Sequence, residues 1–155
     1  MPTHERLLRR ELNSAGADTF TLDAVTVRSI PSVHTFPSLS YRIEADGASV
    51  TVSGDTDFLE GLIELAEETD LLVCESSFPD DMEVPGHLVP SEAGLIADAS
   101  RAKKLLLMHL YPPFDEADIV GHASRRTYAG EIIKARDLMT LTVHRTDDPV
   151  AKSRS

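Results

Sequence analysis

The chain of 155 residues contains no tryptophan and a single cysteine, Cys74, and only 5% of its residues are aromatic. One cysteine excludes an internal disulfide bond, which favours a reducing compartment such as the cytoplasm. No apolar run approaches the roughly 20 residues that a membrane-spanning helix needs, and the charged segment Met1–Glu11 lacks the apolar core of a signal peptide. We therefore expect an aliphatic core, a cytoplasmic location and no membrane contact.

Basic residues are also scarce. Lysine and arginine together number 15 against 26 acidic residues, so the formal net charge is −11. Contacts with nucleic-acid phosphates need clustered Lys and Arg, so the composition argues against a dedicated nucleic-acid-binding domain. The acid excess fits either a high-salt cytoplasm or ordinary surface charge that maintains solubility, and the sequence leaves both interpretations open.

The length and a hydrophobic content of 41% are typical of one folded domain. From residue 48 onward apolar strands alternate with amphipathic helices, which predicts an α/β fold with a mixed sheet. The expected strands are Phe20–Leu22, Val25–Ile30, Tyr41–Ala45, Ala48–Val52, Leu71–Cys74, Lys104–Met108 and Leu138–Val143. The expected helices are Met1–Leu12, Asp57–Thr69, Pro90–Ser100 and Thr127–Ala135. The dipeptide Asp46-Gly47 predicts a hairpin turn between two of the strands.

Ser53-Gly54-Asp55-Thr56 is the most informative segment, because it ends a strand and opens a helix. A carboxylate at the carboxyl end of a strand is where α/β sheets place ligand-binding and catalytic groups. His34, Glu75, His87 and His109 also stand at strand ends or in a loop. Imidazoles and carboxylates gathered at one rim of a sheet are the ligands of first-row metal ions. The pattern therefore predicts a metal site there.

Six segments of this chain follow one another in an order shared with a known family. They are Val33-His34 with Ser40-Tyr41-Arg42-Ile43, Ser53-Gly54-Asp55-Thr56, Val73-Cys74-Glu75-Ser76, Gly86-His87, Leu106-Leu107-Met108-His109-Leu110, and Gly130-Glu131-Ile132 through Asp137-Leu138-Met139. Together they resemble the metallo-β-lactamase superfamily, and within it the ribonuclease Z-like branch of metallo-hydrolases. The resemblance runs from about Asp23 to Val143.

The resemblance implies that this chain is the C-terminal half of the four-layer αββα metallo-β-lactamase sandwich. It implies a binuclear centre with two zinc ions, or manganese, in which His34 binds one ion, Asp55 bridges both and His109 binds the other. His87 is then the proton donor to the leaving group, and Glu75 orients it. The implied function is metal-dependent hydrolysis of a phosphodiester or another small hydrolysable substrate, with RNA as a substrate of complete homologues.

Three replacements depart from the family pattern. Ser40 stands where the family has glycine, Cys74 replaces a histidine, and Leu88-Val89 replace a Ser-Thr pair. These changes favour a generic hydrolase over an enzyme that processes transfer RNA.

The larger departure is the missing His-x-His-x-Asp-His motif, which the histidines at 4, 34, 87, 109, 122 and 144 do not form. Each ion would keep two protein ligands, whereas catalytic zinc usually keeps three. We expect weak metal binding by the chain alone, and a truncated gene, a split gene or a mis-called start would each account for the missing motif. The alternative function is an inactive or accessory half-domain that binds a partner through its exposed sheet face. A homo-oligomer, or a complex with the missing half, is therefore expected.

On this basis the chain divides into an N-terminal helix and lead-in at 1–22, a partial metallo-β-lactamase-like domain at 23–146 and a frayed tail at 147–155. Other features have simpler interpretations. We expect His122 and His144 at the surface, Cys74 as a buried apolar side chain, and Tyr111-Pro112-Pro113 as a rigid turn. A receiver-like domain with Asp55 as phosphoacceptor is not favoured, because no acidic pair follows the first strand.

Overall fold

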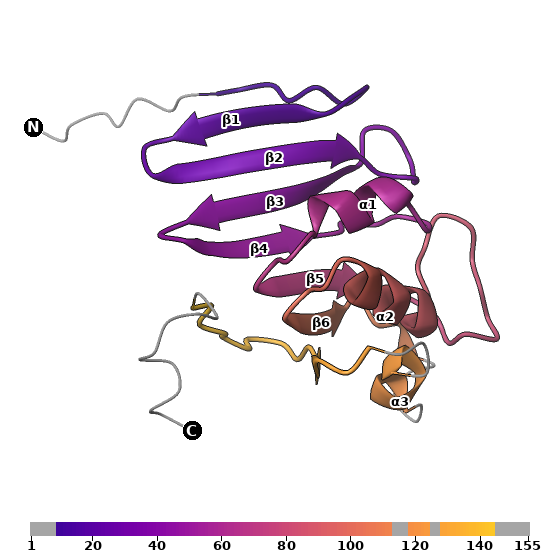
Figure 1. Ribbon diagram of the computed structural model, residues 1–155. Coiled ribbons are helices and arrows are strands. Elements are labelled where there is room, and N and C mark those ends of the chain that lie inside the picture. Colours follow the sequence, from indigo (N-terminus) through magenta and orange to yellow (C-terminus); the bar gives the residue numbers. More distant parts are fainter. Residues whose placement is uncertain (1–8, 113–117, 125–127, 145–155) are drawn as a thin grey trace, which may run out of the picture.

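The computed structural model describes residues 9–112, 118–124 and 128–144. Its main feature is a seven-stranded sheet whose strands lie side by side in chain order (Figure 1). The strands are β1 (Asp18–Leu22), β2 (Val25–Pro31), β3 (Leu39–Ala45), β4 (Ala48–Val52), β5 (Leu71–Glu75), β6 (Lys104–Met108) and β7 (Glu131–Lys134). The helices are α1 (Glu60–Leu65), α2 (Pro90–Ala99) and α3 (Ile119–Ser124). Within these described ranges no helix is both long enough and apolar enough to cross a membrane.

The sheet is mixed, as the sequence predicts. Strands β1 to β4 form an antiparallel meander, and β4 to β7 pair in parallel. The predicted hairpin is confirmed: Ala45 pairs with Ala48, and Asp46 and Gly47 both have positive φ angles, 51° and 76°. Two positive φ angles are what a two-residue type I′ hairpin loop requires. Because β2, β4, β5 and β6 run in the same direction, their carboxyl ends meet at one edge of the sheet.

One face of the sheet carries the core. Leu72 and Leu105 on adjacent strands are fully buried and belong to one cluster with Leu62 of α1, Ile96 of α2 and Ala123 of α3. In Figure 1, α1 and α2 lie in front of the sheet, over its central and lower strands. The cluster is aliphatic except for Cys74 and Tyr128, which agrees with the shortage of aromatic residues in the sequence.

The opposite face, here called the open face, is also apolar. Side chains alternate between the two faces of a strand. Val50 pairs with Leu71, which points to the face opposite that of Leu72, so the residues in register with Val50 lie on the open face. One cross-strand row on this face is Phe20, Val27, Ile43, Val50 and Leu71. A neighbouring row is Tyr41, Val52, Val73, Leu106 and Ile133. All the helices that the structure describes contribute to the core on the other face.

The predicted helix Thr127–Ala135 is wrong, because residues 131–134 form β7, which pairs in parallel with β6. The β-branched pair Ile132-Ile133 fits the pleated edge of a sheet better than a helix. The predicted strand Leu138–Val143 is also wrong, since no regular structure occurs there and Leu138 has a φ of 61°. Helix α3 was not predicted.

Two helix predictions change in extent. The helix expected at Asp57–Thr69 spans only Glu60–Leu65, because Asp57 is held by loop contacts and Glu68 takes a φ of 50°. Of the helix expected at Met1–Leu12, residues 9–12 are not helical, and residues 1–8 lie outside the described part. The tail predicted at 147–155 also lies outside it.

Candidate active site

The predicted site residues stand at one edge of the sheet. His34 follows β2, Asp55 follows β4, Glu75 ends β5 and His109 follows β6. The carboxyl ends of these strands point to the right in Figure 1, where the long loop between β5 and α2 carries His87. The direction of the strands thus brings together residues that are far apart in the sequence.

Three imidazole rings lie in a row at this edge, with His87 in the middle. The ring centroids of His34 and His87 are 4.9 Å apart, and those of His87 and His109 are 5.7 Å apart. On the far side of the row, His109 Nε2 lies 3.7 Å from Asp55 Oδ1. His109 has a φ of 57°, a left-handed conformation that turns the chain sharply at the end of β6.

Glu75 is the most buried charged group of the site, with a side chain only 2% exposed. Its Oε1 accepts a hydrogen bond of 2.5 Å from the Thr56 backbone N–H, and its Oε2 accepts one of 2.5 Å from Ser77 Oγ. Oε2 also lies 3.0 Å from Nδ1 of His87. The carboxylate is therefore fully engaged, and it orients His87 so that Nε2 of that ring stays available. Ser77 was not predicted from the sequence; it follows the quoted Glu75-Ser76 segment directly.

Hydrogen bonds join the loops that carry the histidines. His34 Nδ1 donates to the Gly86 carbonyl over 3.0 Å, and the Gly86 N–H donates to Asp57 Oδ2 over 3.1 Å. Gly86 has a φ of +90°, and a Cβ there would lie 2.9 Å from His34 Nδ1, so only glycine fits. Asp57, which was predicted only as the first residue of a helix, thus fixes the loop before His87.

Cys74 lies beneath the site and is fully buried. Burial raises the pKa of its thiol to about 12, so the group is a neutral thiol rather than a nucleophilic thiolate. The prediction of a buried apolar role is confirmed. His122, which was expected at the surface, is partly exposed, and its Nδ1 lies 3.0 Å from Asp80 Oδ2.

The donor types at this edge suit zinc, and His34 has the arrangement common for a ligand, with one ring nitrogen bound to a carbonyl. The placement does not complete a metal site. No group of three or more His, Cys, Asp and Glu able to hold an ion occurs among the residues that the structure describes. The residues present therefore do not fit a resident metal ion without further ligands.

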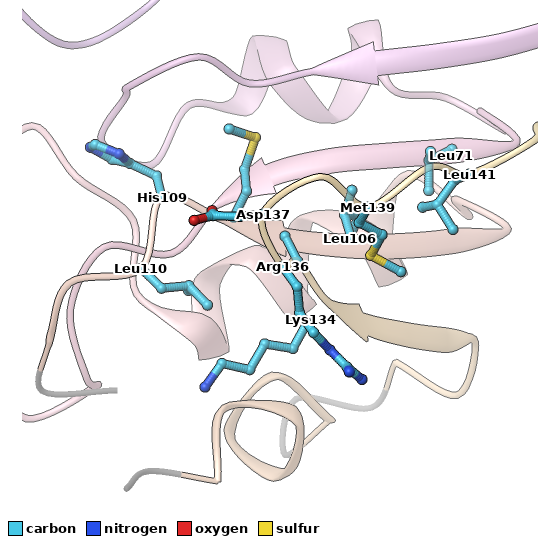
Figure 2. Close-up of a pocket in the computed structure, with 11 residues that line it drawn as sticks. Leu71, Leu106, His109, Leu110, Lys134, Arg136, Asp137, Met139 and Leu141 are labelled. Carbon is cyan, nitrogen blue, oxygen red and sulfur yellow. The ribbon is translucent and has the colours of Figure 1, made fainter. Parts of the chain in front are cut away.

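A cavity of about 600 Å³ borders the site at His109 (Figure 2). Its apolar lining includes Leu71 and Leu106 of the open face, and the segment after β7 covers part of it with Met139 and Leu141. The charged lining residues are Lys134, Arg136 and Asp137. In Figure 2, Asp137 lies on the His109 side of the cavity, whereas the Lys134 and Arg136 side chains extend away from His109. None of these three was predicted from the sequence.

A family model described as a beta-lactamase superfamily domain matches residues 3–110. The chain belongs to the metallo-β-lactamase superfamily. It is similar to the metallo-β-lactamase fold protein YhfI from Bacillus subtilis, whose crystal structure superposes with a TM-score of 0.69 at 27% identity over 77% of this chain and 50% of that one. The predicted fold class is therefore confirmed.

Two curated relatives are similar to this chain in sequence. The uncharacterized protein Rv1339 of Mycobacterium tuberculosis is 34% identical over 112 residues, which are 70% of this chain and 41% of that protein. Ribonuclease Z of Streptomyces coelicolor is 37% identical over 94 residues, which are 57% of this chain and 31% of that protein. This agrees with the predicted ribonuclease Z-like branch, and the match spans less than half of either relative.

Proposed function

We propose that this chain supplies the acid–base part of a site that hydrolyses phosphodiesters, with His87 as the proton donor to the leaving group. The observation that carries the proposal is the pairing of buried Glu75 with partly buried His87, whose Oε2 and Nδ1 lie 3.0 Å apart. A histidine oriented by a carboxylate is an effective general acid near neutral pH. The similarity to proteins named ribonuclease Z supports the choice of phosphodiester substrates, RNA included.

The contacts of Glu75 account for the proton transfer. The carboxylate accepts the Nδ1–H of His87, which leaves the second proton of the imidazolium on Nε2, facing away from Glu75. As a water oxygen bonds to phosphorus and the phosphorus–oxygen bond to the leaving group breaks, Nε2 gives this proton to the departing oxygen. The imidazolium becomes a neutral imidazole, and the proton of the attacking water is released to solvent. Thr56 and Ser77 hold Glu75 in place by their hydrogen bonds throughout.

We further propose His34, Asp55 and His109 as a partial set of metal ligands, for two zinc ions or manganese. His109 Nε2 and Asp55 Oδ1 are close enough to share one ion after small adjustments, and the hydrogen bond of His34 to the Gly86 carbonyl uses Nδ1 rather than Nε2. Each ion then needs ligands beyond those that the structure describes. A cytoplasmic location belongs to this proposal, because the one cysteine is a free thiol.

The experiment compares two phosphodiesters that differ in the leaving group: bis(p-nitrophenyl) phosphate and the dinucleotide uridylyl-adenosine. The chain is assayed with zinc, alone and with the N-terminal half of a full-length homologue. Nitrophenolate leaves without protonation, whereas the ribose alkoxide needs a proton donor. His87→Ala should therefore slow dinucleotide cleavage about 10²–10⁴-fold and affect the nitrophenyl ester much less.

His122→Ala is the matched control, because it removes a histidine paired with a carboxylate outside the site. Equal effects of His87→Ala on both substrates would refute the role of His87. Zinc bound stoichiometrically and resistant to chelators, with turnover by the chain alone, would refute the need for further ligands.

The open face favours a second candidate, an accessory half-domain that binds a partner protein. Ile43 at the centre of this face is 38% exposed, and Leu22 and Met108 at its margins are 60% and 40% exposed. Contiguous apolar surface of this kind marks an interface on a folded protein. A partner bound through Ile43 without any hydrolysis would identify this function, and binding of a second copy is the homo-oligomer predicted from the sequence.

A further inference from the structure

Two aromatic rings stack beside the candidate site. Phe78 follows β5 and Tyr111 follows β6, and their ring centroids are 4.9 Å apart with an angle of 13° between the planes. Each ring also meets a histidine edge-on: Phe78 lies 6.0 Å from His87, and Tyr111 lies 5.3 Å from His109. This pair, here called the Phe78–Tyr111 stack, therefore borders both ends of the His87–His109 contact.

Backbone hydrogen bonds fix the stack relative to the acid–base pair. The Tyr111 N–H donates to the Ser77 carbonyl over 3.3 Å, and the Ser76 N–H donates to the Met108 carbonyl over 3.0 Å. The Ser77 N–H donates to the Leu88 carbonyl over 3.0 Å, next to His87. The same short segments carry Glu75, His87 and the stack, so the backbone that positions the rings is bonded to the backbone of the site.

Core packing does not account for the stack. Tyr111 is 42% exposed, and Phe78 is only partly buried, whereas Tyr128 of the core is 6% exposed. A rigid turn after His109 explains Pro112 but does not require an aromatic ring at position 111. In a chain with 5% aromatic residues, two that stack at the mouth of the site stand out.

We propose that the Phe78–Tyr111 stack binds the planar base of a nucleotide substrate, which adds a third ring to the pair. Bases stack on exposed aromatic rings with little dependence on base identity, and offset stacking between rings is favourable. Stacking also needs no basic side chain, so it suits a chain with a net charge of −11. This inference rests on the proposed function, because the base must bring a phosphodiester to His87.

The test is a titration of the full chain with adenosine and, separately, with ribose, followed by NMR. Neither probe carries a phosphate group, so the titration measures binding of the base without a metal ion and without hydrolysis. We expect adenosine to shift the ring protons of Phe78 and Tyr111, and ribose to leave them unchanged. Tyr111→Leu, which removes the ring at similar volume, should raise the dissociation constant for adenosine about tenfold. Tyr111→Phe should keep it near the wild-type value.

Phe20→Leu is the control for loss of a ring elsewhere, since Phe20 lies on β1 at the other end of the sheet. Equal binding of adenosine and ribose, no binding of either, or unchanged adenosine binding in Tyr111→Leu would each overturn the proposal. If Tyr111→Leu does not fold, the ring-proton shifts of the wild-type chain decide. Adenosine bound at the stack without any hydrolysis contradicts the proposed function alone, and hydrolysis without adenosine binding contradicts the stack alone.

Discussion

Replacement of Glu75 tests how the structure orients His87. The Glu75 carboxylate is 2% exposed and receives hydrogen bonds from the Thr56 N–H and Ser77 Oγ besides its pairing with His87. In Glu75→Ala the Thr56 N–H loses its acceptor inside the protein, which costs about 1–3 kcal/mol. His87 loses its charged partner as well, but its side chain is 15% exposed and Ser77 Oγ lies 3.2 Å from its Nδ1, so the added cost should be smaller than for a fully buried ion pair.

Glu75→Gln separates this loss of stability from the chemistry. The amide keeps the shape of the side chain, and its carbonyl can still accept from the Thr56 N–H, so we expect a loss of only about 1–2 kcal/mol. The amide NH₂ then faces Nδ1 of His87, and two donors cannot bind each other. Neutral His87 should therefore carry its proton on Nε2 in the variant and on Nδ1 in the wild-type chain.

Urea unfolding measures the stability changes, and long-range ¹H–¹⁵N NMR spectra of the imidazole report which nitrogen is protonated. A smaller change in the midpoint for Glu75→Ala than for Glu75→Gln would contradict the hydrogen-bond argument. Ser77 Oγ also lies 3.2 Å from Nδ1 and can accept its proton, so an unchanged tautomer in both Glu75→Gln and the double variant Glu75→Gln, Ser77→Ala would show that Glu75 does not orient His87. The proposed proton donor would then lose its basis.

Three further predictions concern the turn before Asp55, the buried thiol and the open face. Gly54→Ala should lower the free energy of unfolding by about 1–3 kcal/mol, because Gly54 has a φ of +61° and a Cβ would lie 2.8 Å from a backbone oxygen; Gly61→Ala in α1, where the new Cβ meets only side chains at 3.4 Å or more, should be neutral or stabilising in the same urea titration. Burial raises the pKa of the Cys74 thiol from 9.0 to about 12. Between these two pH values the thiol therefore stays protonated in the folded chain and loses its proton in the unfolded chain. Stability should therefore fall as the pH rises from about 9 to 12, less steeply in Cys74→Ala, as measured by thermal unfolding. Light scattering should report a dimer or larger species, and Ile43→Glu on the open face should give monomers; a monomeric wild-type chain would contradict this.

Much of the fold could be predicted because the central segments carry strong local signals. The Asp46-Gly47 turn sets the register of β3 against β4, and apolar runs with helical segments between them identify β5 and β6. The grouping of His34, Asp55 and His109 at one edge follows from strand direction, which the alternation of elements implies. The roles of these residues stay predictions.

The C-terminal part could not be predicted for a physical reason. Residues 127–135 contain apolar side chains at spacings that suit a helix, but the exposed edge of β6 offers unpaired backbone groups, and pairing with that edge makes β7. The contacts of Ser77, Asp57 and the Phe78–Tyr111 stack likewise depend on loops that meet only in the folded chain. Local sequence patterns contain no information about such contacts between distant loops.

The incomplete ligand set and the open face have one explanation in common. Met108, the last residue of β6, projects its 40% exposed side chain on the open face, and His109 directly after it belongs to the site. A polypeptide that packs on the exposed side chains of Ile43 and Met108 would therefore lie next to His109, where the described residues do not complete a metal site. Such packing would bury apolar surface, and each Å² buried stabilises the complex by roughly 25 cal/mol. The packed polypeptide would then hold the added ligands in place. Metal affinity and association with the added polypeptide should consequently change together. Ile43→Glu, which alters none of the proposed ligands, should weaken both.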